Sequence, residues 1–180
     1  LLNVGRICKQ KEQLTLIRSL PIVLKKFPNA VCIFASPIYE EEYYNCMLKE
    51  IQKYNLQDHI IFLGGVELRE VIDLYKSCDV FVLPSIYETW PLAICEAWAA
   101  KIPVIASSID NIKAMVKDNY NAMLFPVFDH NLLAEKIETI LADKELANKL
   151  IENGRREVEK KYSWRKIAEM IEKHYFRVLS

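Results

Sequence analysis

Residues Asp79 to Ser107 read DVFVLPSIYETWPLAICEAWAAKIPVIAS and contain one complete strand–helix–strand pattern. Two short apolar runs, Val80–Leu83 and Val104–Ala106, flank a segment near residues 91–100 whose apolar spacing is helical. The runs are continuous and do not alternate with polar residues, as in strands that are covered on both faces. Two such strands joined by a helix predict a right-handed βαβ unit in a parallel sheet.

The same alternation of strand and helix extends in both directions from this unit. Further apolar runs predict strands at Leu1–Val4, Val31–Ala35, Ile60–Leu63 and, more weakly, Met123–Phe125. Helical spacing lies near residues 11–26, 40–54 and 67–77. We therefore expect an α/β fold with a Rossmann-like open parallel sheet.

The C-terminal part of the sequence carries helical patterns without strands. They lie near residues 130–142, 144–152 and 155–178. We expect the last to break at Tyr162-Ser163, with Ser163 capping a final amphipathic helix. The expected organisation is one domain over residues 1–180, in which residues 155–180 form a C-terminal helical tail. The apolar positions of the final helix are Ile167, Met170, Ile171 and Tyr175.

Composition narrows the class of protein. A length of 180 residues suits one α/β domain or one half of a two-domain enzyme, and 52% hydrophobic with 27% charged residues is typical of a globular chain. The 24 basic and 24 acidic residues cancel, which leaves no global electrostatic case for nucleic acid or anionic lipid as a partner. Only four glycines are present, against about a dozen at average usage, which argues against glycine-rich phosphate loops.

Cysteine and targeting patterns favour a cytoplasmic protein. The five cysteines are scattered without a C-x-x-C pair, and we expect buried, reduced thiols. No apolar run approaches the roughly 18 residues of a spanning helix, and no signal-peptide pattern opens the chain. Because the sequence starts directly on a strand pattern without methionine, we expect a domain excised from a longer protein.

The loop after the first strand carries two cations. In an open parallel sheet, ligands bind beyond the carboxyl ends of the strands. Gly5 lets the backbone turn there, and Arg6 and Lys11 place positive charge near a helix N-terminus, which itself favours anions. A bound phosphate explains this pattern, and two solvated surface cations remain the alternative.

The loop after the fourth strand carries two acids. We expect Thr89 to cap the following helix and Pro91 to lie in its first turn. Glu88 then precedes the helix, and Glu96 lies about 10 Å further along it. One carboxylate could accept from sugar hydroxyls and the other from a ribose, with a diphosphate between them. Glu88 as a favourable N-terminal charge and Glu96 as a surface residue are the alternative, although the apolar neighbours of Glu96 argue against it.

Together these loops resemble a known family. The chain resembles the C-terminal, donor-binding domain of retaining glycosyltransferases with the GT-B fold, often called glycosyltransferases group 1 or family four. The resemblance runs from Asn3 to Leu179. It rests on Asn3-Val4-Gly5-Arg6-Ile7 with Lys11, on Asp79–Ser85 followed by the E-x7-E pair Glu88 and Glu96, and on Glu96–Ala100 followed by Ile102–Ser107.

The resemblance implies roles for particular residues. Arg6 and Lys11 would bind the donor diphosphate and stabilise it as it leaves, and Glu88 would contact the transferred sugar, so these three are the expected catalytic residues. Glu96 would hold the ribose. The implied donor-binding set is Gly5, Arg6, Lys11, Gly64, Glu88, Trp90, Leu92 and Glu96, in which Gly64 would contact the base through its backbone and Trp90 and Leu92 would contact sugar and phosphate through theirs.

The resemblance also implies a reaction. A hexose would move from a nucleotide diphosphate sugar, a UDP-sugar or GDP-sugar, to an acceptor held by an N-terminal domain that this chain lacks. The implied chemistry needs no metal and no cofactor beyond the donor substrate, and the isolated domain would bind donor but turn over little. We expect no nucleic-acid partner and no membrane span in this chain. Peripheral membrane attachment through the missing domain stays open, as do the donor base and sugar, the acceptor and the oligomeric state.

The chain departs from the family mainly at glycines. Glycine commonly stands where this chain has Glu12, Thr89, Pro91, Lys101, Asp110, Asn111, Asn119 and Ala122. Asp110, Asn111 and Asn119 can still adopt left-handed backbone conformations, which cost Thr89 and Lys101 more. A catalytically inactive homologue that binds or stabilises a partner is therefore the alternative function. A NAD-dependent dehydrogenase is disfavoured because no G-x-G-x-x-G follows the first strand.

Overall fold

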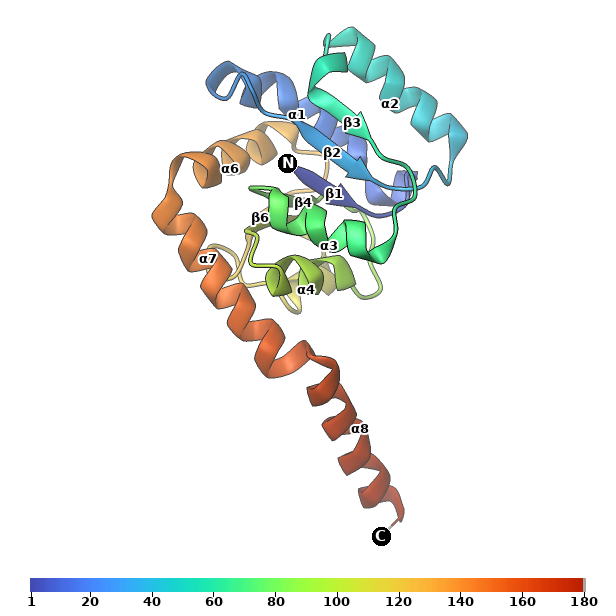
Figure 1. Ribbon diagram of the computed structural model, residues 1–180, viewed down its shortest axis with the longest axis vertical. Coiled ribbons are helices and arrows are strands. Elements are labelled where there is room, and N and C mark those ends of the chain that lie inside the picture. The colour runs from blue at the N-terminus through green and yellow to red at the C-terminus, as the bar shows by residue number, and fades with distance from the viewer. Residues whose placement is uncertain (180) are drawn as a thin grey trace.

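The computed structural model describes residues 1–179 and contains one six-stranded parallel sheet with strand order β3-β2-β1-β4-β5-β6 (Figure 1). This architecture confirms the expected Rossmann-like α/β fold. The strand order reverses between β1 and β4, which lie side by side at the centre of the sheet. The strands are β1 (Leu2–Val4), β2 (Cys32–Ala35), β3 (Ile60–Phe62), β4 (Phe81–Leu83), β5 (Val104–Ser107) and β6 (Met123–Phe125).

Helices connect the strands and continue beyond the sheet. The α-helices are α1 (Gln13–Lys26), α2 (Glu41–Lys53), α3 (Leu68–Ser77), α4 (Leu92–Ala99), α5 (Asp110–Lys113), α6 (His130–Ala142), α7 (Lys144–Glu157) and α8 (Trp164–Leu179). Two short 3-10 helices, η1 (Lys9–Lys11) and η2 (Gln57–His59), precede α1 and β3. Within residues 1–179, no helix is both long and apolar enough to cross a membrane.

The two faces of the sheet bury separate hydrophobic cores. Val82 belongs to a core that includes residues of α1, α2 and α6, whereas its neighbours Phe81 and Leu83 belong to one that includes residues of α3 and α4. This division follows from the alternation of side chains along a strand. Since both faces are covered, the strands can be apolar at every position, which explains the continuous runs in the sequence.

Close packing joins α7 to α4. Trp98 of α4 is fully buried and donates from Nε1 to the Asn121 carbonyl at 2.8 Å. Gly154 lies directly on the indole, because a Cβ atom built there would be 2.2 Å from Trp98 Cδ1. The helix α7 can therefore approach α4 only through a residue without a side chain.

The C-terminal tail differs in one respect from its prediction. The expected separation between residues 152 and 155 is wrong, because α7 runs on through Asn153 and Gly154, which are both buried. Asn153 donates from Nδ2 to the Tyr120 carbonyl at 2.9 Å, so tertiary contacts hold this segment helical. A π-helical turn, η3 (Val158–Tyr162), follows, and the chain breaks at Ser163 as expected. Ser163 accepts from the Lys166 amide at 3.4 Å and caps α8.

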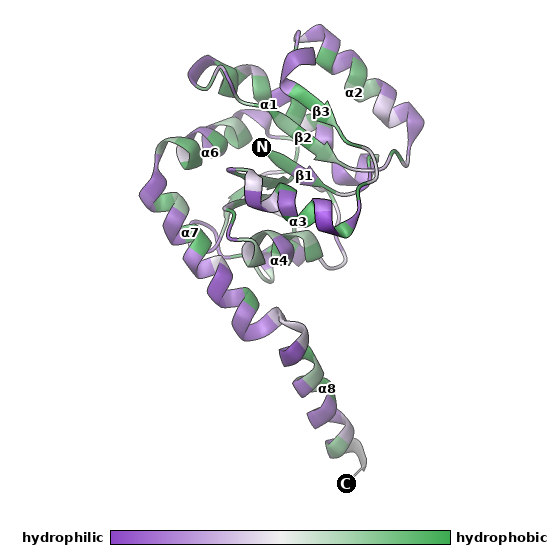
Figure 2. Ribbon diagram, in the orientation of Figure 1, coloured by the Kyte–Doolittle hydropathy of each residue, from purple (hydrophilic) through white to green (hydrophobic). Residues whose placement is uncertain are grey.

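The helix α8 projects away from the body of the domain (Figure 1). Its predicted apolar positions Met170, Ile171 and Tyr175 are all exposed, and charged residues lie between them (Figure 2). The fourth predicted position, Ile167, is half-buried at the groove beside Trp90, but the apolar side beyond it faces solvent and packs against no core within residues 1–179.

Several non-glycine residues adopt left-handed backbone conformations. Among residues 1–179 these are Glu12, Asn55, Lys101, Asn119 and Phe128. Of the residues that stand where the family has glycine, Asn119 and Lys101 use this conformation. Thr89, Asp110 and Asn111 do not, the last two because they lie in the short helix α5.

The cysteines are free thiols. Cys8, Cys32 and Cys95 are buried as expected, but Cys46 is exposed and Cys78 is half-buried. Burial raises the pKa of Cys95 to about 11 and that of Cys32 to about 12, so both stay protonated and unreactive near neutral pH.

Candidate functional site

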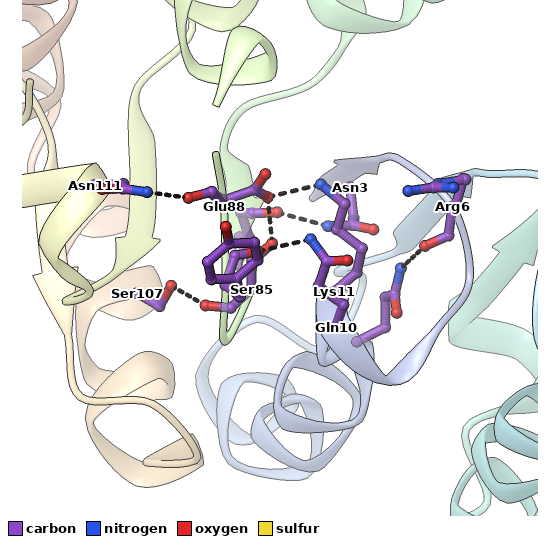
Figure 3. A network of polar contacts seen from close by, with 11 residues as sticks. Asn3, Arg6, Gln10, Lys11, Ser85, Glu88, Ser107 and Asn111 are labelled. Atoms are coloured by element: carbon purple, nitrogen blue, oxygen red, sulfur yellow. Dashed lines mark hydrogen bonds and ion pairs between the residues drawn. The ribbon is translucent and has the colours of Figure 1, made fainter. Parts of the chain in front are cut away.

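Two loops meet at the carboxyl edge of the sheet, where β1 and β4 lie side by side (Figure 3). One loop follows β1 and carries Gly5, Arg6 and Lys11. The other follows β4 and carries Glu88. This is the point where the strand order reverses, and open α/β sheets bind ligands in the crevice at such a point.

Glu88 is the buried centre of this region. Its side chain is 7% exposed, and its Oε1 atom accepts from Lys11 Nζ at 2.6 Å and from Ser85 Oγ at 2.7 Å. The Lys11 side chain is 16% exposed. A carboxylate at this depth needs such partners, because an unpaired buried charge is strongly unfavourable.

Hydrogen bonds from three other segments hold the loop that carries Glu88. The Ile86 amide donates to the Gln10 carbonyl at 2.9 Å, and Gln10 Nε2 donates to the Tyr87 carbonyl at 3.0 Å. Asn111 Nδ2 donates to the backbone carbonyl of Glu88. Ser107 Oγ likewise donates to the Ser85 carbonyl (Figure 3). The loop is therefore fixed to the β1 loop on one side and to β5 and α5 on the other.

Arg6 lies apart from the ion pair (Figure 3). Its side chain is exposed, and its guanidinium carbon lies 4.5 Å from the centre of the Tyr39 ring. The backbone turn before it has a φ of +150° at Gly5, which disfavours residues with a side chain. The backbone of this loop is also fixed, since Gln13 Nε2 donates to the Arg6 carbonyl at 2.8 Å.

A buried acid lies at the start of α1. Glu12 has a left-handed backbone with φ 48°, and its carboxylate accepts from Thr15 Oγ1 at 3.1 Å. Burial raises the pKa of Glu12, and the Thr15 hydrogen bond and the Arg18 charge only partly oppose this. Glu12 therefore holds its proton more tightly than an exposed glutamate does.

The remaining predicted residues of the β4–α4 segment line a second hollow. Trp90, Leu92 and Glu96 border a groove of about 400 Å³ whose opposite wall is formed by α7, η3 and α8. The Trp90 ring contacts the Tyr162 ring edge to face, with centroids 5.4 Å apart. This groove places aromatic, apolar and acidic side chains together.

Three local predictions for this segment are wrong. Thr89 does not cap α4, and Pro91 does not lie in its first turn, because the helix starts at Leu92 with Pro91 at the capping position and without a side-chain cap. The buried position of Glu88 and its carbonyl bond to Asn111 keep the chain extended for longer. Glu96 is exposed to solvent rather than enclosed by apolar side chains, although it borders the groove and accepts from Tyr75 Oη through Oε2 at 3.1 Å.

The predicted residues thus fall into separate groups. The structure brings Lys11 and Glu88 into direct contact, and it places Trp90, Leu92 and Glu96 along one groove. Arg6 and Gly64 share no described contact with either group. Gly64 lies on the loop after β3 with φ +70°, and open space surrounds the position of a Cβ atom there. Within residues 1–179, no cluster of three or more His, Cys, Asp or Glu side chains could hold a metal ion.

The sequence analysis does not select several residues that contact this region. Ser85 could be found from its position between a strand end and Glu88, since polar residues at that edge are candidates. Asn111 and Gln10 act through distant loops and leave no local signal. Tyr75 has the sequence pattern of a buried residue, which does not indicate that its hydroxyl reaches Glu96.

Comparison with known proteins points to one family. The sequence profile described as glycosyl transferases group 1 matches residues 1–157. An uncharacterized glycosyltransferase from Methanocaldococcus jannaschii is 30% identical over 168 residues, covering 93% of this chain and 42% of that protein. A UDP-Gal:alpha-D-GlcNAc-diphosphoundecaprenol alpha-1,3-galactosyltransferase from Escherichia coli is 28% identical over 146 residues, covering 79% of this chain and 36% of that protein. The chain spans less than half the length of these relatives.

A solved structure agrees with this fold. The C-terminal domain of a glycosyl transferase group 1 family protein from Francisella tularensis superimposes with a TM-score of 0.82 and 25% sequence identity. The match covers 91% of this chain and 86% of that one.

Proposed function

The chain belongs to the glycosyl transferases group 1 family, and from that premise we propose that it is the donor-binding domain of a retaining glycosyltransferase. In this proposal a hexose is transferred from a nucleotide diphosphate sugar. The observation that carries it is the ion pair between Lys11 and Glu88 at the reversal point of the sheet. It joins a cation and an acid from two loops at the edge where such sheets bind ligands.

The charges suggest how a diphosphate would bind. Lys11 is largely buried beside Glu88, so an incoming diphosphate would share this cation with the carboxylate. Arg6 is exposed, and within residues 1–179 its described side-chain contact is with Tyr39, so its side chain could turn toward the ligand without disturbing the core. Both cations would offset the negative charge that grows on the leaving diphosphate.

The acids would orient the rest of the donor. Glu88 would accept a hydrogen bond from the transferred sugar through Oε2, because Oε1 already accepts from Lys11 and Ser85. Glu96 would accept from the ribose. The backbone amides of Trp90 and Leu92 would contact sugar and phosphate, Gly5 would supply the turn, and the loop at Gly64 would meet the base.

A relative supports the class of donor. The name of the Escherichia coli protein specifies UDP-Gal, a nucleotide diphosphate sugar. We propose a donor of that class for this chain, a UDP-sugar or GDP-sugar. No resident metal or cofactor is part of the proposal.

The rest of the enzyme would lie outside this chain. The chain spans 42% of the length of the Methanocaldococcus jannaschii relative, which leaves room for a second domain. We propose that this domain holds the acceptor and that the exposed apolar side of α8 packs against it. The isolated donor domain would then bind nucleotide but turn over little, and any membrane attachment would depend on the other domain.

Calorimetry with uridine and guanosine diphosphate tests the proposal. We expect micromolar binding of one of them to the 180-residue chain. The binding should weaken by roughly tenfold or more in Arg6→Ala and in Glu96→Ala, because each removes a contact to the ligand. Arg165→Ala and Glu172→Ala, both on the exposed helix α8, serve as matched controls and should bind as the unmodified chain does.

Two outcomes separate the proposal from its alternative. Absence of binding at millimolar nucleotide, with circular dichroism showing an intact fold, would favour the inactive homologue that stabilises a partner. Binding of nucleotide by a longer polypeptide that releases no nucleoside diphosphate from any UDP-sugar or GDP-sugar would also favour it.

A further inference from the structure

We propose that Tyr75 is a positioning residue for Glu96 and thereby sets the affinity of the site for ribonucleoside diphosphates. This inference rests on the proposed function, in which Glu96 accepts hydrogen bonds from a ribose. Its starting point is a contact between two helices: Tyr75 Oη, in the last turn of α3, donates to Glu96 Oε2 on α4 at 3.1 Å. The two helices are neighbours on one side of the sheet (Figure 1).

The two partners differ in mobility. Tyr75 is 2% exposed, and its ring packs against Phe81 with centroids 5.4 Å apart, so its hydroxyl occupies a fixed point. Glu96 is exposed and could sample several rotamers. A fixed donor on Oε2 selects one of these rotamers and leaves Oε1 available to a ligand hydroxyl. Such preorganisation raises affinity by lowering the entropy that binding removes.

The bond from the Tyr75 hydroxyl to Glu96 is not explained only by the need of a buried hydroxyl for an acceptor. A backbone alternative exists, the Ala93 carbonyl, but it lies at 3.4 Å, longer than the 3.1 Å to the carboxylate. A hydrogen bond to an ionised acceptor is also stronger than one to a neutral carbonyl. Burial, together with the nearby Glu96 charge, raises the pKa of Tyr75 above its ordinary value, so the hydroxyl stays protonated and remains a donor.

The contact also determines which oxygen of the Glu96 carboxylate can accept from a ligand. A carboxylate only accepts hydrogen bonds, and with Tyr75 donating to Oε2 the Oε1 atom of Glu96 stays available to a ligand hydroxyl. A ribose, with two neighbouring hydroxyl donors, matches this arrangement, and acidic residues serve this purpose in other nucleotide-binding α/β folds. A 2′,3′-dideoxyribose has no hydroxyl donor at these positions, so Tyr75 would not increase the affinity for a ligand that carries it.

The test compares two ligands in one conservative variant. Tyr75→Phe removes only the hydroxyl. Calorimetry measures the binding of uridine and guanosine diphosphate, and of their 2′,3′-dideoxy analogues, to the unmodified 180-residue chain and to the variant. We expect the variant to bind the ribonucleotide roughly two- to tenfold more weakly, the size of one ordinary net hydrogen bond, and to bind the dideoxy analogue with unchanged affinity.

Two controls isolate the positioning role. Tyr44→Phe removes a hydroxyl from a ring that packs on Phe62 and should leave both affinities unchanged. In a Glu96→Ala background, Tyr75→Phe should weaken any residual ribonucleotide binding no further, because the group that it positions is gone.

The outcomes distinguish this inference from the proposed function. Equal affinity of Tyr75→Phe and the unmodified chain for the ribonucleotide overturns the positioning role, as does an equal loss for ribose and dideoxyribose ligands. If the unmodified, folded chain binds neither nucleotide, the proposed function fails, and this inference fails with it.

Discussion

Lys11 and Glu88 are 77 positions apart in the sequence, and their side chains meet with Nζ and Oε1 2.6 Å apart. Each belongs to a loop that leaves one of the two central strands. The loops are short and their backbones are fixed by further bonds, so the pair is built into the fold and does not depend on flexible surface side chains. Its energetic consequences can be measured without any ligand.

Removing the charge of Lys11 should destabilise the fold, because the Glu88 carboxylate then stays buried without a counter-charge. Lys11→Met leaves the Glu88 carboxylate with Ser85 as its partner and without a counter-charge. We expect the free energy of unfolding to fall by about 3 kcal/mol, as for other buried pairs that lose one member. Urea denaturation at neutral pH measures it.

The double variant Lys11→Met with Glu88→Gln is the control. A neutral amide needs no counter-charge and can still accept from Ser85, so more than half of the lost stability should return. If the two losses simply add, the buried charge is not the cause.

Gly154→Ala should destabilise, although alanine is the better helix former. In an ordinary helix interior this change would stabilise by about 1 kcal/mol. Here the new Cβ would lie 2.2 Å from Trp98 Cδ1, so α7 must shift away from α4. We expect a net loss of about 1–3 kcal/mol, as in other overpacked cores. Thermal unfolding checks the sign.

A second glycine provides the matched comparison. Gly65→Ala places its Cβ 3.9 Å from Pro37, an ordinary contact, and should change stability by less than about 0.5 kcal/mol. A stabilising Gly154→Ala would show that the helix can retreat from the indole at no cost.

Lys101→Gly should stabilise the protein. Lys101 follows the end of α4 with φ 63°, a conformation that costs a residue with a Cβ about 1–2 kcal/mol. Its side chain is exposed, so its loss removes little packing. We expect a gain of about 1 kcal/mol in chemical denaturation. The same change at Lys149, which is exposed within α7, should instead cost about 1 kcal/mol, and a gain there would argue against the backbone explanation.

Glu12 should make stability fall as the pH rises. Its pKa is raised above the ordinary 4.5 by burial, so the folded chain holds the proton more tightly than the unfolded chain. The stability that protonated Glu12 contributes is fully present below pH 4.5, and it is lost as the pH rises through the raised pKa of the folded chain. The stability of the unmodified chain relative to Glu12→Gln should decline over this range, measured by urea denaturation at a series of pH values.

Glu50 provides a control of opposite sign. The hydrogen bond from Arg18, the largest cause, lowers the pKa of Glu50 below 4.5. Its contribution is present above 4.5 and is lost as the pH falls through the lowered value. Glu50→Gln should therefore cost stability at neutral pH and little in acid. The same pH trend in both variants would contradict these assignments.

The sequence predicts the strands well because each buried strand shows as a short continuous run of apolar residues. A run such as Val31–Ala35 is apolar throughout since both faces are covered, and the observed strand Cys32–Ala35 differs by one residue. The start of α4 is less predictable. Thr89 is a good capping residue by type. However, Lys11 and Ser85 bond the Glu88 carboxylate and Asn111 bonds its carbonyl, and the helix starts only at Leu92.

The site is predictable in its residue types but not in its pairings. Lys11 and Glu88 can be selected because parallel strands bring their carboxyl-end loops together. The Tyr75–Glu96 contact depends on how closely α3 and α4 lie side by side on the sheet, which the apolar pattern of either helix alone does not specify. The contact of Arg6 with Tyr39 likewise joins two exposed side chains that no periodic pattern relates.

The strand order also divides the sheet into two triplets, β3-β2-β1 and β4-β5-β6, which meet along β1 and β4. Asn3 Nδ2 bonds the Val82 carbonyl at 2.9 Å across this boundary, and the Lys11–Glu88 pair spans it as well. A nucleotide clasped by both loops would hold the triplets together, and any opening that parts them would release it. Amide exchange at the outer strands, β3 and β6, should then slow on saturation as much as exchange at the centre.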